Sequence, residues 1–152
     1  MITVETAVRQ ILISDTDVAA ELAGNIYPDA APQNIVDADP SKFRPYAVYE
    51  IIADAAEHHI AASSGLAYAV LRYTSVSMNA TEARAISEAI REALDGYSGV
   101  VTVGAETLAI EVITIERTRR NYAPPRDAGA AGTYMMIQEM QIGYQQSVPV
   151  FS

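Results

Sequence analysis

The residue types that could carry catalysis or bind a metal are few in this sequence, and their spacing suits neither task. His58 and His59 are adjacent, and neighbouring residues of a regular strand point to opposite sides, so the two rings cannot chelate one metal together. Asp29, Asp37 and Asp39 share one loop, but the glycine turn and the distal glutamate of a calcium-binding loop are missing. The histidines are therefore expected in a polar turn, and the aspartates in a solvated loop.

Sequence motifs of the common enzyme families are also missing. The chain contains no HExxH zinc motif, no GxSxG nucleophile elbow and no GxxxxGK(S/T) phosphate loop. It contains no cysteine, which excludes disulfides and thiolate metal ligands. We therefore expect no enzymatic activity, no cofactor and no bound metal ion.

A cluster of basic, aromatic and proline residues is the remaining candidate binding site. Its members, here called the arginine segment, are Arg117, Arg119, Arg120, Tyr122, Pro124, Pro125 and Arg126. Arg and Tyr are favoured at protein interfaces, and proline reduces the entropy that a backbone loses on binding. The flanking sequences predict strands that end near Thr118 and begin near Thr133. The segment is thus expected on a hairpin loop of about fourteen residues, which reaches roughly 20 Å beyond the sheet.

The charge of the whole chain distinguishes between the ligands that this segment could take. The net charge is −9 and the isoelectric point is near 4.5. The molecule as a whole therefore repels polyanions, and nucleic-acid binding is not expected. A basic arm instead complements the acidic body of another copy. We predict an interface with another protein chain, and phosphate binding or a solvated surface loop are the alternatives.

Length and composition indicate one folded domain over residues 1–152. A chain of this length buries roughly 70% of its unfolded surface. Half of the residues are apolar and 19% are charged, which is too apolar for an intrinsically disordered chain. The first residues lack the basic start and apolar run of a signal peptide, and no stretch approaches about 20 consecutive apolar residues. The expected compartment is a reducing cytoplasm.

The clearest helix that hydrophobic periodicity predicts covers residues 79–96. Asn79 and Glu82 stand in capping-box positions at its start, and Gly96 ends it. An apolar stripe on one face should pack across a sheet. The stripe consists of Ala83, Ile86, Ala89, Ile90, Ala93 and Leu94.

Two shorter helices and a long loop are predicted before this helix. The helices cover residues 3–13 and 15–23, and either Asp15 or Thr16 caps the second one. Residues 24–45 contain four prolines and many turn formers, which indicates an extended loop. Such a loop is either pinned against the body or in contact with a partner.

Runs of aromatic and β-branched residues predict the strands. These strands cover 46–54, 66–78, two stretches of 99–118 around a turn at Gly104–Ala105, and 133–146. Neither face of 66–78 is cleanly polar, which predicts a central strand covered on both sides. Short turns join most strands. We therefore expect an α+β fold with a largely antiparallel sheet, helices packed on one face, a long hairpin arm and an extended N-terminal loop.

Three short motifs stand in a fixed order along the chain. A helix pair ends in Gly-x-Ile-Tyr-Pro, here Gly24 to Pro28, with a further Ala-Pro at Ala31–Pro32. RPYAVYEIIAD (44–54) contains Pro-Tyr-x-x-Tyr, and TEARAISEAIREALDG (81–96) is a Glu-Ala helix that ends in Leu-x-Gly. In this order and spacing the chain resembles the tail-completion proteins of long-tailed phages, the tail-terminator and tail-to-head-joining group. The run NYAPPRDAGAAGTY (121–134) departs from the family, which often carries Tyr-Glu-Pro and a shorter run.

The resemblance implies a structural virion protein without catalytic residues. Such a protein forms a ring, typically a hexamer, that caps the tail tube and joins it to the head-side connector. Its partners would be further copies of itself, the tail tube protein and the connector or stopper protein, without a membrane. DNA would pass through the channel without specific binding, which the net negative charge favours. The arginine segment would form a subunit or tube interface in the tail or neck of the virion, after assembly in the host cytoplasm.

Other functions remain open at this point. Within phage structure, the chain could be a head-completion (stopper) protein or a minor tail protein. From another class, it could be a small ligand-binding α+β domain. A deep polar pocket would favour the ligand-binding domain, whereas a flat monomer with protruding hairpins would favour assembly.

Overall fold

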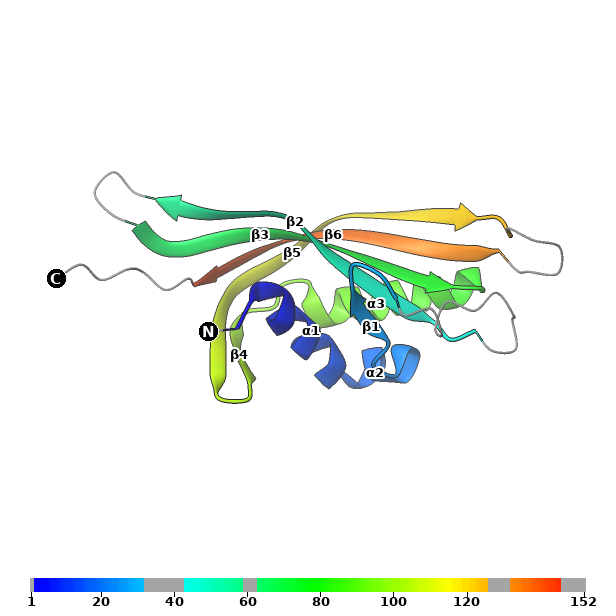
Figure 1. Ribbon diagram of the computed structural model, residues 1–152, viewed down its shortest axis with the longest axis horizontal. Coiled ribbons are helices and arrows are strands. Elements are labelled where there is room, and N and C mark those ends of the chain that lie inside the picture. The colour runs from blue at the N-terminus through cyan, green and yellow to red at the C-terminus, as the bar shows by residue number, and fades with distance from the viewer. Residues whose placement is uncertain (1, 32–42, 59–62, 126–131, 146–152) are drawn as a thin grey trace.

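The computed structural model describes residues 2–31, 43–58, 63–125 and 132–145, with the backbone alone for 54–58 and 63–64. Within these residues it contains three helices and one six-stranded sheet. All three helices lie on the same face of the sheet (Figure 1). The α+β fold with helices packed on one face of a largely antiparallel sheet is therefore confirmed.

The sheet is built around two long hairpins. The elements are α1 (Val4–Ser14), α2 (Thr16–Leu22), β1 (Ile26–Pro28), β2 (Tyr46–His58), β3 (Ser63–Ser77), α3 (Ala80–Leu94), β4 (Gly99–Val103), β5 (Glu106–Ala123) and β6 (Thr133–Gln145). The strand order is β1-β2-β3-β6-β5-β4, with β1 parallel to β2 and every other neighbouring pair antiparallel. The β2–β3 and β5–β6 hairpins point toward opposite ends of the molecule (Figure 1).

The helix starts follow the predicted capping residues. Asn79 Oδ1 accepts hydrogen bonds from the backbone N–H groups of Thr81 and Glu82, at 2.8 and 3.1 Å. The Glu82 carboxylate does not accept a hydrogen bond from the Asn79 N–H directly. Ser77 Oγ donates to Glu82 Oε1 at 2.6 Å and accepts from the Asn79 N–H at 3.1 Å, so a hydroxyl closes the capping box. In α2 the cap is Asp15, whose carboxylate accepts two backbone N–H groups at 3.0 Å.

The hydrophobic core lies between the helices and the face of the sheet that they cover. The predicted apolar stripe of α3 is buried, apart from the partly buried Ala93. It packs with buried side chains of the sheet, including Leu71, Ile113, Met140 and Ile142. The rings of Tyr49 and Tyr73 stack in this core with centroids 5.4 Å apart.

Two strand predictions need correction. Strand β3 is central, as expected, but in the described chain only its helix side is covered, and its other face is half-exposed. Strand β5 does not end near Thr118; it pairs with β6 as far as Ala123↔Thr133. Most of the arginine segment is therefore strand and not loop. Pairing with β6, which is set by register over the whole hairpin, outweighs the low strand preference of a charged run.

Other predicted features lie at or beyond the limits of the described residues. The β2–β3 turn is shorter than predicted, because β2 continues to His58 and β3 begins at Ser63. His59, Asp37, Asp39 and Arg126, and 32–42 of the long N-terminal loop, lie outside the described residues. In the described part of the chain, the helices are too short or too polar to cross a membrane.

Candidate assembly interface

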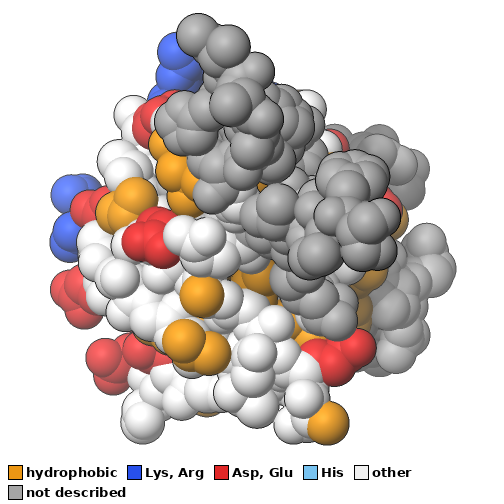
Figure 2. All heavy atoms as spheres, turned by 90° about the vertical axis from the view of Figure 1, so that its left-hand side faces the viewer, with side chains coloured by type: hydrophobic (Ala, Val, Ile, Leu, Met, Phe, Trp, Pro, Cys, Tyr) orange, Lys and Arg blue, Asp and Glu red, His pale blue; other side chains and the backbone are white. Residues whose placement is uncertain are grey.

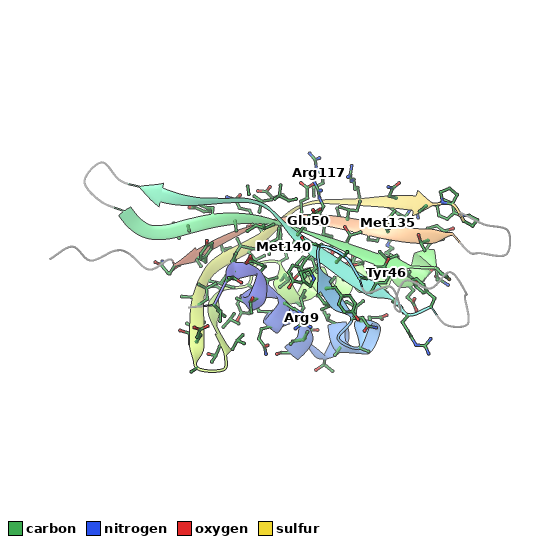
Figure 3. The ribbon with its side chains drawn as sticks, in the orientation of Figure 1. Arg9, Tyr46, Glu50, Arg117, Met135 and Met140 are labelled. Atoms are coloured by element: carbon green, nitrogen blue, oxygen red, sulfur yellow. The ribbon has the colours of Figure 1, made fainter. Side chains whose placement is uncertain are left out.

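The face of the sheet that the helices leave open carries a row of alternating charges. The cross-strand pairs Glu50↔Arg72, Arg72↔Glu139 and Glu139↔Arg117 extend this charge row over β2, β3, β6 and β5. Arg72 donates hydrogen bonds to Glu50 at 3.1 Å and to Glu139 at 3.0 Å. In Figure 3, Arg117 lies on the open side of the sheet, whereas Met140 lies between the sheet and the helices. The row starts with a carboxylate on β2 and ends with a guanidinium on β5.

The charge row contributes little to the stability of the monomer. The side chains of Arg72, Glu139 and Glu50 are 32%, 26% and 47% exposed, and ion pairs between such side chains stabilise a fold only weakly. Hydrogen bonds to Glu139 and then to Glu50 raise the pKa of Arg72, which favours its charged form. The row therefore fixes a charge pattern on the open face and adds little folding energy.

The structure distributes the arginine segment over both faces of β5. Arg117 and Arg119 stand opposite Glu139 and Ile137 and so belong to the open face. Arg120 stands opposite Met136, on the side of the sheet that bears the helices. All three arginines are exposed. The sequence cluster is thus a strand with charge on both faces and not a single basic patch.

Tyr122 is held in place within its own hairpin. Its ring packs against that of Tyr134, with centroids 4.9 Å apart, and is 49% exposed. A Cβ atom at Gly132 would overlap the Tyr122 hydroxyl, so a larger residue at this position would require the tyrosine ring to move. Pro124 and Pro125 follow the end of β5 and are exposed. The tyrosine is therefore a preorganised, half-exposed aromatic side chain at the end of the hairpin.

Two long strands have an edge without a neighbouring strand in the described chain. β1 pairs with Ala47–Tyr49 of β2, which leaves residues 50–58 without a partner strand on that side. β4 pairs with β5 only as far as Ile110. The turn after α3 then covers a little more of β5, because Ile113 N–H donates to Tyr97 O at 3.1 Å and Ile115 N–H donates to Asp95 Oδ1 at 3.1 Å.

The free edges are therefore residues 50–58 of β2 and residues 116–123 of β5, on opposite sides of the sheet. Three of the five large apolar side chains that are exposed in the described chain lie on them, namely Ile51, Ile52 and Tyr122. Neither edge could be recognised from the sequence, because each depends on how far a neighbouring strand or loop reaches.

The rest of the surface is mainly acidic. Residues 2–31, which form α1, α2 and β1, contain five acidic residues and one basic residue. Figure 2, which faces the end with the β4–β5 turn, shows separate groups of Asp and Glu side chains and few Lys or Arg side chains. The arginines of β5 are thus a local exception on an acidic molecule, which agrees with the predicted electrostatic contrast.

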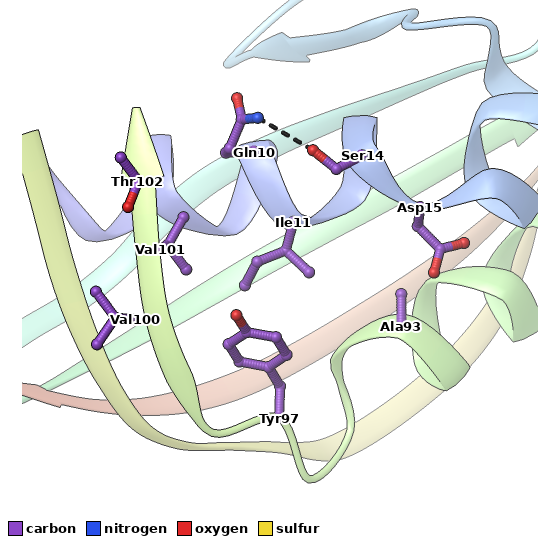
Figure 4. Close-up of a pocket in the computed structure, with 9 residues that line it drawn as sticks. All are labelled: Gln10, Ile11, Ser14, Asp15, Ala93, Tyr97, Val100, Val101 and Thr102. Carbon is purple, nitrogen blue, oxygen red and sulfur yellow. Dashed lines mark hydrogen bonds between the residues drawn. The ribbon is translucent and has the colours of Figure 1, made fainter. Parts of the chain in front are cut away.

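A shallow hollow of about 400 Å³ lies between α1, β4 and the turn after α3. Figure 4 shows its lining, in which Gln10 donates a hydrogen bond to Ser14 at 3.0 Å. Its one carboxylate, Asp15, is already occupied as the cap of α2. The described residues also include no group of three or more His, Asp or Glu side chains that could hold a metal. This hollow does not provide the deep polar pocket that a ligand-binding domain would need.

A buried polar cluster lies between the sheet and α3, away from any surface. Gln138 Nε2 donates to the Ser87 carbonyl at 2.9 Å, and neither Tyr73 Oη nor Gln138 Oε1 has a partner in the described chain. Burial raises the pKa of Tyr73 well above its ordinary value. Because the cluster has no access to solvent, we assign it to the packing of α3 on the sheet.

Comparison with known proteins supports the fold. No protein-family model matches the sequence, and no curated protein matches it. Among solved structures, a chain of the "Virion of native gene transfer agent (GTA) particle" has a TM-score of 0.62 and 16% sequence identity. The match covers 93% of this chain and 94% of that chain. At this identity the comparison shows a common fold over almost the full length of both chains.

Proposed function

We propose that this chain is a structural protein of a phage-like virion and, within the virion, a tail-completion (tail-terminator) protein. Its copies form a ring, expected to be a hexamer, that caps the tail tube and joins it to the connector on the head side. The observation that carries the proposal is the fold shared with a chain of a gene transfer agent virion over 93% of this chain and 94% of the other.

The arrangement of two sequence motifs supports the tail-completion assignment. The Gly-x-Ile-Tyr-Pro motif forms β1, and the Pro-Tyr-x-x-Tyr motif begins β2. The two motifs are paired side by side, with Ile26↔Ala47 and Pro28↔Tyr49 in register. Two of the three segments that carry the resemblance, about twenty residues apart in the sequence, thus form one parallel strand pair.

The shape and charge of the monomer favour head-to-tail assembly. The two long hairpins point toward opposite ends, and the two free edges lie on opposite sides of the sheet (Figure 1). A surface on one side that binds a different surface on the other side generates a closed ring when the rotation closes. The net charge of −9 suits a ring whose channel passes DNA without retaining it.

The test is the mass of the purified protein in solution, measured by light scattering, alone and with tail tubes and head connectors from the same particle. A ring of about six copies, or a monomer that forms one on meeting tail tubes, supports the proposal. Binding to connectors but not to tubes would identify a stopper protein instead. A monomer that ignores both would contradict a structural role at this joint.

A further inference from the structure

We infer that the ring closes by antiparallel strand addition, in which residues 116–123 of β5 in one copy pair with residues 50–58 of β2 in the next copy. The inference rests on the proposed function, because it assumes that copies of this chain form a ring. It assigns an occupant to the two edges that the monomer leaves without a neighbouring strand.

The two edges match in length and lack two residue types that usually protect edge strands, although both edges carry β-bulges and charged side chains. The β2 edge has nine residues and the β5 edge has eight. Neither contains proline or lysine, which natural proteins place on edge strands to prevent pairing between molecules. The outer strands β1 and β4, by contrast, are short, with three and five residues. The exposed side chains of Ile51, Ile52 and Tyr122 would lose water contact when the edges pair.

The two edges also carry opposite charge. Residues 50–58 include three acidic residues and no arginine or lysine, whereas residues 116–123 include three arginines and one glutamate. The charge row shows the same relation at the level of single side chains, since it ends with Glu50 on β2 and Arg117 on β5. When residues 116–123 pair with residues 50–58, the three arginines lie beside an edge whose only Asp, Glu, Lys or Arg residues are acidic. This complementarity selects a second copy of the chain as the occupant.

Strand direction is compatible with a ring of any number of copies. The long strands β2, β3, β6 and β5 alternate in direction, and there are four of them. Rotation about an axis along the strands therefore always places β5 of one copy antiparallel to β2 of the next. The free edge of β2 extends from the charge row, whose ends Glu50 and Arg117 are labelled in Figure 3, toward one end of the molecule, and that of β5 extends toward the other (Figure 1). Full overlap of the edges thus requires a stagger between copies, which tilts the strands as in other closed sheets.

Cysteine cross-linking tests this pairing, and the wild-type chain contains no cysteine that would interfere. One double variant, Ile52→Cys with Tyr122→Cys, reports the staggered pairing with full overlap. A second, Glu50→Cys with Arg117→Cys, reports the unstaggered register, in which residues 118–120 of β5 would meet residues 47–49 of β2 that β1 already occupies. Each is treated with a bismaleimide that spans roughly 8 Å, which covers direct and diagonal cross-strand neighbours. The four single variants are the controls, because equivalent residues four strands apart are separated by about 19 Å.

The expected result is a ladder of covalent multimers up to the size of the ring in the Ile52→Cys, Tyr122→Cys variant, and no multimers in the single variants. A ladder only in the Glu50→Cys, Arg117→Cys variant would overturn the pairing of these two edges. A ring of unchanged mass without a ladder in either double variant would overturn strand addition and leave the proposed function intact. Dimers from a single variant would overturn it as well, because they would show that equal edges pair with each other. A monomer that neither cross-links nor binds tubes would contradict both proposals.

Discussion

The arginines on the open face of β5 give the sharpest prediction about assembly. Replacement of Arg117 and Arg119 by glutamate reverses the charge of this edge where it would meet the acidic edge of the next copy. We expect the monomer to remain folded. Only Arg117 has an acidic cross-strand neighbour, Glu139, and a like-charge pair there costs up to about 1 kcal/mol, which is small beside the 5–15 kcal/mol that stabilise a typical domain.

The magnitude follows from the exposure of the side chains. Both arginines are exposed, and an exposed ion pair is worth about 0.2–1 kcal/mol. Reversal removes one such attraction and adds a repulsion of similar size, so each substitution costs about 1 kcal/mol per subunit interface. The double variant loses about 2 kcal/mol at every interface, which weakens each contact roughly 30-fold.

The assay is light scattering over a concentration series at low and high salt. Salt screens exposed charges, with a Debye length of about 10 Å at 0.1 M. The wild-type ring should therefore weaken as salt rises, whereas the Arg117→Glu, Arg119→Glu variant should assemble better. A matched control carries Arg44→Glu and Arg84→Glu, which are exposed arginines away from β5 and change the net charge by the same amount.

Two results would refute this reasoning. Equal weakening of variant and control would show that net charge, and not the position on β5, governs assembly. A double variant with the mass and the salt response of the wild type would show that the β5 arginines do not hold the ring.

Three further predictions concern the monomer. Ile90→Asp or Leu94→Asp places a charge in the packed stripe of α3 and should abolish the cooperative urea transition; a normal transition would contradict the packing. Asn79→Ala removes the cap of α3 and should lower the free energy of unfolding by about 1 kcal/mol, whereas Thr81→Ala in the same turn should change it by less than about 0.5 kcal/mol. Burial raises the pKa of Tyr73 well above its ordinary value of 10.0. As pH rises through 10.0, the unfolded state therefore loses a proton that the folded state keeps, and the free energy of unfolding falls. Tyr73→Phe should reduce the loss of unfolding free energy between about pH 8 and pH 11, and an unchanged loss would show that other groups cause it.

The sequence predicted those features that local patterns determine. The stripe and caps of α3 repeat at helical spacing within about eighteen residues, so periodicity alone located the helix and its buried face. The turn at Gly104–Ala105 was predicted for the same reason, because turn residues interrupt an apolar run. The prediction that the helices lie on one face of the sheet followed from the short turns that join most strands.

The candidate interface depends on contacts between distant segments, and this is why the sequence did not show it. Residues 119–123 are strand because they pair with 133–137, and no local signal separates them from a charged loop. The free edge of β5 begins at Glu116 because Asp95 and Tyr97 bind the strand just before it. The charge row likewise forms only when four strands pair in the observed register, which no local pattern in the sequence shows.

The length of β5 also determines how the molecule transmits force. This strand runs from its hairpin with β4 to Ala123, and it is paired with β6 from Ile110 onward, with register shifts between Ile110 and Val112 and between Ile115 and Arg117. A pull on its tip along the strand direction loads the hydrogen bonds of this ladder in shear, all at the same time, whereas a pull across the strands would open them one by one. Near its middle the same strand is bonded to the turn after α3. Tension applied at the tip by a neighbouring molecule would therefore spread into the helical layer and would not be borne by a loop.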